Sequence, residues 1–405
     1  MSGTLPPDKK RILIVGSGPW QLHLLRKARD LGYATVNTNL YEDSPGFALA
    51  DVGIAVDIFD RDRHVEIARE YGVQGVTSDQ IDIAVPTVAY VCEQLGFPGI
   101  GGRCADLFTN KVRMREFCGT RGVRQPRHRV CASPEEALAA VPALGDYPVI
   151  LKPTNNRSSR GVHKVGDDAA LMAALADTMA NSREPRFLVE EYIGGLELSV
   201  EGIKTRHGHH VTLAVSRKRQ FAHNTVLDWQ VWYPRDDRSI DGEALARAHD
   251  AMIEATRLPF GITHAEYKLR DGQFYLIEFA ARGGGANISS HVIPLKSGID
   301  ATGLLVRMAM GETVEEVRRL DTGLAVMLEF FELAPGTVKA IHGLEDIRAL
   351  PGVVDAAVTF RPGETLAPPA HGGVRAGHFI ASADSDRALD ELCVRVRKTL
   401  RVDYT

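Results

Sequence analysis

A lysine at the end of an apolar run is the first residue of this chain whose surroundings suggest chemistry. Val149-Ile-Leu leads into Lys152, and a loop of small polar residues follows from Thr154 to Gly161. A lysine at the end of a buried strand is costly unless its ammonium group meets an anion. The hydroxyls and backbone N–H groups of the loop, with Ser158 and Ser159 among them, are suited to closing over phosphates. The pattern favours a phosphate site, and a surface lysine beside an ordinary hairpin is the alternative.

A second candidate follows where another apolar strand ends in carboxylates. Phe187-Leu-Val precedes Glu190 and Glu191, and Ile193 leads through two glycines to Glu197. A backbone edge at such a hinge can pair with an adenine, and a carboxylate can accept from its amino group or from ribose hydroxyls. The segment favours a nucleoside site, with a solvated strand end as the alternative.

The third group of residues combines two glutamates with an arginine. Glu266 and Glu278 stand on the two arms of a predicted hairpin whose turn is Asp271-Gly272, so their carboxylates are expected to lie side by side. Two carboxylates inside apolar strands repel each other unless a cation lies between them. Oxygen ligands next to phosphates suit Mg²⁺, and Arg282 is placed to steady a transferring phosphoryl group or an acyl phosphate. A pair of outward-facing glutamates is the alternative.

Two kinds of element must position these residues. The N-terminal part alternates strand and helix patterns, with strands expected at 11–15, 34–37, 52–56 and 75–77. This alternation predicts an α/β unit, a parallel sheet with helices on both faces. After a helix predicted at 110–120, a compact α+β module follows, and long antiparallel strands dominate the part beyond it.

The composition narrows the class of protein. The 405 residues carry a formal net charge of -4, which gives no reason to expect a nucleic-acid partner. The five cysteines are odd in number and form no CxxC pair, so neither a disulfide framework nor a zinc site is indicated. No run approaches the roughly 18 apolar residues needed to span a bilayer, and no secretory signal precedes the first strand. We expect a cytoplasmic protein with no membrane partner.

Taken in order, these segments resemble the ATP-grasp superfamily, specifically its carboxylate-amine ligases of the biotin-carboxylase-like and L-amino-acid ligase branch. Gly16-Ser-Gly-Pro-Trp-Gln21 and Asn110-Lys111-Val-Arg-Met114 extend the resemblance over most of the chain. It implies an ATP-grasp fold of three parts. Residues 1–120 would form a Rossmann-like parallel-sheet domain, residues 121–192 a small mobile lid, and residues 193–405 a large antiparallel-sheet domain with a C-terminal α+β subdomain.

The resemblance also implies a role for each matching residue. The residues that would bind ATP are Lys111, Lys152, Ser158, Ser159, Glu190, Glu191, Ile193 and Glu197. Glu266 and Glu278 would bind Mg²⁺, with Mn²⁺ as a possible substitute. Arg282 would act at the reacting centre, and Lys152 would share in catalysis through the phosphates.

The acceptor pocket is expected around Gly284, Asn287 and His291. Lys218, Arg219 and His223 are expected on a long loop before Trp229 and are further candidates for the same pocket.

Two features depart from the patterns considered. The family often has Asn two residues after the second metal glutamate, whereas this chain has Ala280, which leaves the number of Mg²⁺ ions open. Gly16-Ser-Gly also begins like a dinucleotide fingerprint, but Gln21 replaces the third glycine and Asn37 stands where an acidic residue would close the second strand.

The resulting prediction is an enzyme, an ATP-dependent ligase that activates a carboxylate as an acyl phosphate and passes it to an amine, releasing ADP and phosphate. An amino-acid-like substrate is expected. The alternatives are a bicarbonate-activating carboxylase component of the biotin or purine type and a catalytically silent ATP-binding regulatory protein. The resemblance further implies a homodimer.

Overall fold

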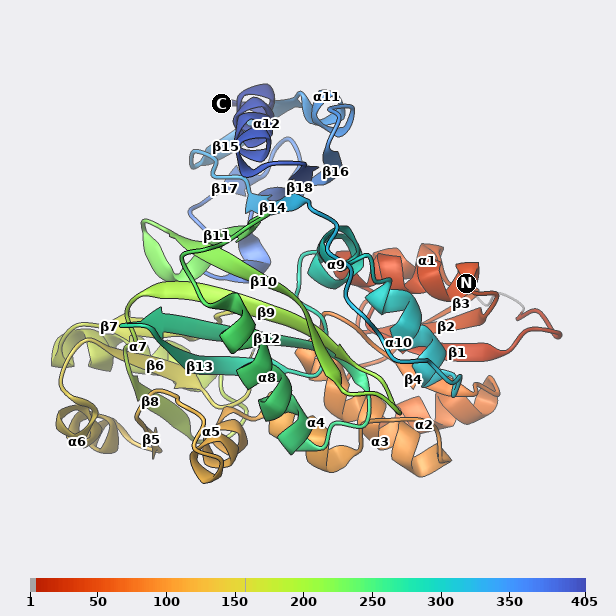
Figure 1. The fold of residues 1–405 in the computed structure, drawn as a ribbon, viewed down its shortest axis with the longest axis horizontal. Helices are drawn as coiled ribbons and strands as arrows, with labels where there is room; N and C mark the ends of the chain where they lie inside the picture. The colour runs from red at the N-terminus through yellow and green to blue at the C-terminus, as the bar shows by residue number, and fades with distance from the viewer. Residues whose placement is uncertain (1–4, 157) are drawn as a thin grey trace.

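The N-terminal sheet is parallel, with strand order β3-β2-β1-β4. The computed structural model describes residues 5–156 and 158–405 (Figure 1). The strands are β1 (Arg11–Val15), β2 (Ala34–Asn39), β3 (Val52–Ala55) and β4 (Gly75–Thr77). The helices around it are α1 (Leu22–Asp30), α2 (Arg61–Glu70) and α3 (Val85–Leu95). The predicted α/β alternation is confirmed.

Two further helices lead out of this sheet. α5 (Lys111–Thr120) agrees with the predicted helix, and the side chain of Asn110 caps it by accepting from the N–H groups of Val112 and Arg113. α4 (Gly102–Thr109) was not predicted, because it is short and follows a segment rich in glycine and proline.

A small antiparallel sheet comes next, with strand order β5-β8-β6-β7. Its strands are β5 (His128–Cys131), β6 (Val149–Pro153), β7 (His163–Val165) and β8 (Phe187–Glu191), and its helices are α6 (Pro134–Leu144) and α7 (Asp168–Ala180). The apolar strands predicted before Lys152 and before Glu190 are confirmed as β6 and β8. Lys152 and Glu190 thereby come to neighbouring strands of one sheet.

The large sheet has eight strands in the order β13-β12-β9-β10-β11-β14-β18-β16. The strands are β9 (Leu196–Lys204), β10 (His210–Phe221), β11 (Asn224–Tyr233), β12 (Gly261–Arg270), β13 (Gln273–Ala280), β14 (Ala325–Phe330), β16 (Val353–Val358) and β18 (Gly377–Ala383). Asp271 and Gly272 have φ values of 51° and 70°, as a tight hairpin turn requires, so the predicted turn is confirmed.

The prediction of a long loop before Trp229 is wrong. Lys218 and Arg219 lie within β10, which forms a hairpin with β11, and His223 lies at the turn. The charged side chains of Arg217, Lys218 and Arg219 obscured the continuation of the strand predicted at 211–217. Arg217 and Lys218 are paired with carboxylates of other parts of the chain.

Helices cover both faces of the large sheet. One face packs against α4, α5 and α8 (Gly242–Thr256) through Phe279 and its neighbours, and the other packs against α9 (Ile293–Ser297) and α10 (Ala301–Ala309). Burial of these apolar faces fixes α5 beside β13. The N-terminus of α5 is therefore held at the edge of the sheet where Glu278 lies.

The C-terminal part completes the large sheet and adds a smaller one (Figure 1, top). The smaller sheet has the order β17-β15-β19, formed by β15 (Gly336–His342), β17 (Thr365–Leu366) and β19 (Arg401–Tyr404), and the accompanying helices are α11 (Leu344–Arg348) and α12 (Asp386–Thr399). Among the described residues, no helix is long and apolar enough to cross a membrane.

Candidate active site

Glu266 and Glu278 are cross-strand partners in the register of β12 and β13. Lys218 of β10 donates to the carboxylate of Glu266, and Lys111 Nζ lies 2.9 Å from Glu278 Oε1. Burial would raise the pKa of Glu266, but Lys218 and then His264 outweigh that effect and hold the pKa well below its usual value. The carboxylate of Glu266 is therefore ionised, and it lies beside that of Glu278.

This pair fits a hard divalent cation. No group of three or more His, Cys, Asp or Glu side chains within the described ranges could hold a metal ion, so the protein offers two carboxylates and no further such ligand. Ala280, which is 2% exposed and pairs with His264 in the register, adds no ligand. Mg²⁺ prefers oxygen ligands and commonly takes the rest of its shell from phosphates and water, so two glutamates suffice.

Lys152 is a buried residue of strand β6 in the small antiparallel sheet. It is 4% exposed, and its Nζ lies 2.7 Å from Glu190 Oε2, so the surface-lysine alternative is wrong. Burial lowers the pKa of Lys152 to about 8, with the neighbouring Arg115 and Lys111 acting in the same direction. Burial alone would raise the pKa of Glu190, but Arg115 and Lys152 outweigh it and lower that pKa to about 2.

The carboxylates at the hinge are already engaged by cations of the chain. Glu190 is held by Arg115 and Lys152, and Glu191 by Arg127 at 2.8 Å and Arg270 at 3.2 Å. Ionic contacts of this kind orient the strand end. If this segment binds adenine, we therefore expect the backbone groups after Glu191, toward Ile193, to make the contact.

Glu197, expected at the ribose, lies further along β9. Its carboxylate is 2.7 Å from Lys268 Nζ, 3.0 Å from Gln220 Nε2 and 3.6 Å from Lys218 Nζ. Lys218 thus links Glu197 to Glu266, and of the three basic residues considered for the acceptor pocket it is the one that contacts a predicted metal ligand.

The phosphate loop lies against the body of the molecule. Lys111 Nζ donates to Asn156 O at 2.9 Å, Ser159 Oγ donates to Val226 O at 3.1 Å, and Gly372 N donates to Ser158 O at 3.1 Å. Arg157, which belongs to the predicted loop, lies outside the described residues. The loop therefore joins the small antiparallel sheet to α5 on one side and to the β10–β11 hairpin on the other.

Arg282 reaches back to the N-terminal sheet. Its Nε and Nη2 atoms lie 2.8 and 2.9 Å from the carboxylate oxygens of Asp82, and Asp79 accepts from Gly283 N at 2.7 Å and Ser289 Oγ at 2.6 Å. Asp79 and Asp82 follow β4, which lies on the opposite side of β1 from β2. Ligands of open parallel sheets bind at such a switch point, a signal that could have identified both aspartates from the predicted strands.

The residues of the expected acceptor pocket lie where three parts of the chain meet. The backbone N–H of Asn287 donates to Gln80 Oε1 at 2.9 Å. Its side-chain amide donates to Asp355 Oδ2, also at 2.9 Å. The ring of His291 lies 5.1 Å from that of His23 of α1. A Cβ built on Gly284 would lie 3.1 Å from Glu201 Oε1, so a glycine fits this close approach.

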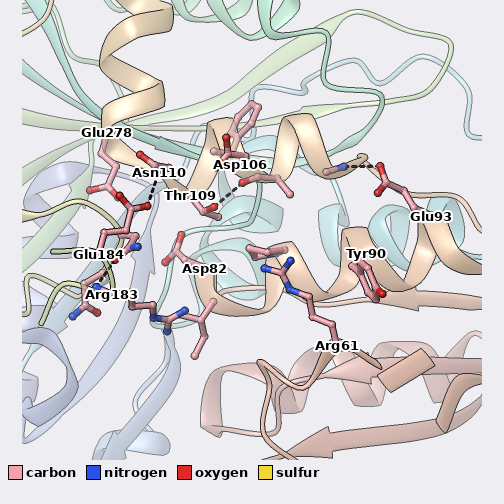
Figure 2. A pocket seen from close by; sticks show the side chains of 17 residues that line it. Arg61, Asp82, Tyr90, Glu93, Asp106, Thr109, Asn110, Arg183, Glu184 and Glu278 are labelled. Carbon is pink, nitrogen blue, oxygen red and sulfur yellow. Dashed lines mark hydrogen bonds between the residues drawn. The ribbon is translucent and has the colours of Figure 1, made fainter. Parts of the chain in front are cut away.

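A cavity of about 390 Å³ opens beside Glu278 (Figure 2). Glu278, Asn110 and Glu184 lie toward one end, and Tyr90 and Glu93 toward the other. The wall also includes Asn155 and Asn156 of the phosphate loop and Asp82. The cavity thus extends from Glu278 to the region between α3 and α4.

Two family models match the chain. Residues 145–290 match the ATP-grasp domain, and residues 329–405 match the L-amino acid ligase C-terminal domain 2. Residues 145–290 therefore form an ATP-grasp domain. Residues 329–405 match a domain that is named after the L-amino acid ligases.

Named relatives match parts of the chain. The chain is 28% identical over 249 residues to a formate-dependent phosphoribosylglycinamide formyltransferase of a Synechococcus species, covering 60% of this chain and 63% of that protein. It is 37% identical over 109 residues to a D-alanine–D-alanine ligase of Stutzerimonas stutzeri, covering 27% of this chain and 34% of that protein. The alignments therefore span about two thirds or less of these relatives.

The fold is shared with an L-amino acid ligase from Bacillus licheniformis, with a TM-score of 0.80 and 21% identity over 98% of this chain and 99% of that chain. A biotin carboxylase domain dimer of the 2-oxoglutarate carboxylase of Hydrogenobacter thermophilus gives a TM-score of 0.77 at 16% identity, covering 97% of this chain and 90% of that chain. The predicted ATP-grasp fold, with its parallel and antiparallel sheets, is confirmed.

Proposed function

We propose that this chain is an ATP-dependent carboxylate-amine ligase that joins amino-acid-like substrates through an acyl phosphate, releasing ADP and phosphate. The observation that carries the proposal is the opposed pair Glu266 and Glu278, with Lys111 on one carboxylate and the phosphate loop within reach of the same lysine. The C-terminal domain match supports the choice of amino acids as substrates.

The phosphate-binding side of the reaction falls to two lysines. Lys111 lies at the N-terminus of α5, where the helix dipole adds to its positive charge. Lys152 is buried within strand β6. Glu266 and Glu278 would hold Mg²⁺, which would supply neutralisation of charge on the phosphates.

The reacting side falls to Arg282 and the loops around it. The guanidinium group is fixed by Asp82, so it is held in one orientation before any substrate arrives. A carboxylate oxygen would attack the terminal phosphorus of ATP, and an amine would then displace phosphate from the acyl phosphate. Such chemistry depends on positioning and charge stabilisation more than on a protein nucleophile.

Closure of the phosphate loop would keep water away from the acyl phosphate. Contacts of Ser158 and Ser159 with Gly372 and Val226 support this role, because they give the loop a defined place against the body.

The test is release of phosphate from ATP with Mg²⁺ against a panel of amino acids, singly and in pairs, with mass detection of products. The proposal expects release with particular pairs and a product lighter than their sum by one water. Absence of release with every pair, while Mg²⁺–ATP still raises the unfolding temperature, would overturn it and favour the regulatory alternative.

We also propose a homodimer. The support is likeness to the biotin carboxylase domain dimer described above. Sedimentation velocity of the purified chain tests it: a species of twice the chain mass supports the dimer, and a monomer at micromolar concentration contradicts it.

A further inference from the structure

Arg115 is a fully buried arginine in the middle of the predicted nucleotide site. Its side chain is 1% exposed, its Nε lies 2.7 Å from Glu190 Oε1, and its Nη2 lies 3.2 Å from Glu190 Oε2. The same Nη2 donates to Ile277 O at 2.7 Å. One guanidinium group therefore joins α5, the lid strand β8 and strand β13 of the large sheet.

The position of Arg115 in its helix places it beside the phosphate lysine. Arg115 follows Lys111 by four residues in α5, so the two side chains project from the same face one turn apart. Lys111 reaches Glu278 and Arg115 reaches Glu190. The helix thus holds both carboxylates through two cations.

Burial of these three charged side chains gives the fold little net stability. Arg115, Glu190 and Lys152 are all less than 5% exposed, and buried ion networks commonly stabilise a fold no better than apolar residues of similar volume. Arg115 Nη1 is buried and has no hydrogen-bond partner among the described residues, which adds the cost of a lost hydrogen bond. A role in positioning accounts for a charge in this place.

We propose that Arg115 is a positioning residue of the nucleotide site: it holds Glu190 in a fixed geometry against Lys152 and ties the lid strand to the strand that carries Glu278. The proposal rests on the function proposed above for the site, but it concerns how the site binds Mg²⁺–ATP and can be tested without turnover. With Arg115 in place, Glu190 shares its charge between two cations. Lys152 is then left with part of its positive charge available for a phosphate.

The charges that face Lys152 come from three elements. Glu190 lies on β8, Arg115 and Lys111 lie on α5, and His128 lies on β5. Of the cations, Arg115 and Lys111 both lower the pKa of Lys152. Removing Arg115 should therefore strengthen the pairing of Lys152 with Glu190 and raise the pH at which Lys152 loses its proton.

The experiment measures the affinity of Mg²⁺–ATP by calorimetry as a function of pH for the full chain and three variants. Arg115→Met removes the charge and the hydrogen bonds to Glu190 and Ile277 O. Arg115→Lys keeps the charge but cannot make the paired hydrogen bonds of a guanidinium group. Arg113→Met is the control. Arg113 lies two residues earlier in the same helix, with a side chain that is 59% exposed and contacts Glu116 and Asp106.

We expect Arg115→Met to weaken binding at neutral pH by about tenfold, a loss typical of one disturbed charged contact. The same variant should move the basic limb of the affinity profile to a higher pH than in the wild-type chain. Arg115→Lys should weaken binding with little shift of the limb, and Arg113→Met should change neither. The shift of the limb separates positioning from a general loss of stability, since a fold that is only less stable keeps the wild-type limb.

Unchanged affinity and limb in Arg115→Met, with only a lower unfolding temperature, would overturn the proposal. If that variant does not fold, Arg115→Lys carries the test, and wild-type affinity in it is the contradicting result. Failure of the proposed ligase function would show instead as absence of phosphate release in the wild-type chain, with its nucleotide affinity intact.

Discussion

Glu266 and Glu278 face each other across two neighbouring strands, and each carboxylate contacts a lysine from a distant part of the chain. Lys218 comes from the adjoining part of the same sheet, and Lys111 comes from the helix that leads out of the N-terminal domain. The charge balance of the pair therefore depends on correct docking of α5 against β13.

Glu278→Gln should separate nucleotide binding from chemistry. The amide keeps the shape of the side chain but gives Mg²⁺ a poorer ligand and leaves Lys111 without its carboxylate. We expect phosphate release to fall by at least about a hundredfold, the scale of a lost metal contribution to the transition state, with nucleotide affinity little changed. Glu243→Gln, on an exposed face of α8, is the matched control and should be fully active. More than half of the wild-type rate in Glu278→Gln would contradict the metal assignment.

Lys152 should give the reaction a basic limb near pH 8. Its pKa is lowered to about 8, so the protonated form that can bind phosphate is present below that pH and is lost above it. In Lys152→Arg the guanidinium keeps its charge across this range, and the limb should disappear from kcat/KM for ATP. A limb that persists unchanged in Lys152→Arg would assign it to another group.

Ala280→Asn tests how many ligands the protein gives to the metal. Ala280 is 2% exposed and stands two residues beyond Glu278, so an asparagine there would be buried and polar. Without metal, the unsatisfied amide should cost about 1–3 kcal/mol of stability. With Mg²⁺ and ATP the loss should be recovered, and half-maximal activity should need less Mg²⁺. Equal destabilisation with and without metal would show that the side chain does not reach the ion.

Gly195→Ala should strongly destabilise the connection between lid and large sheet. Gly195 has a φ of +102°, and a Cβ built on it would lie 2.1 Å from Leu269 O. We expect a loss of about 3 kcal/mol or more in denaturant unfolding, from strain and backbone overlap together. Gly194→Ala is the control, because a Cβ there meets only Tyr192 at 3.8 Å. Similar unfolding midpoints for the two variants would show that the backbone at Gly195 relaxes easily.

Periodicity and turn signals predicted most of the fold. The apolar runs of β1 and β2 and the Asp271-Gly272 turn are local patterns, so a single sequence contains them. The hairpin of β10 and β11 was missed, because Lys218 looks like a surface residue until Glu197 and Glu266 are brought beside it by other strands.

The candidate site was only partly predictable for a related reason. The opposition of Glu266 and Glu278 follows from hairpin register and was foreseen. The contact of Arg282 with Asp82 joins residues far apart in sequence, and its existence depends on how the N-terminal sheet docks. Arg115 is one of several charged residues of the helix predicted at 110–120, and its burial against Glu190 sets it apart only in the folded chain.

The measurement that tests the central claim most directly uses an amino acid labelled with ¹⁸O in its carboxylate, together with ATP, Mg²⁺ and an amine partner that supports turnover. A reaction through an acyl phosphate transfers one labelled oxygen to the released phosphate, and we predict this transfer with each turnover. Phosphate that carries no label, with turnover demonstrated by product mass, would contradict the proposed mechanism.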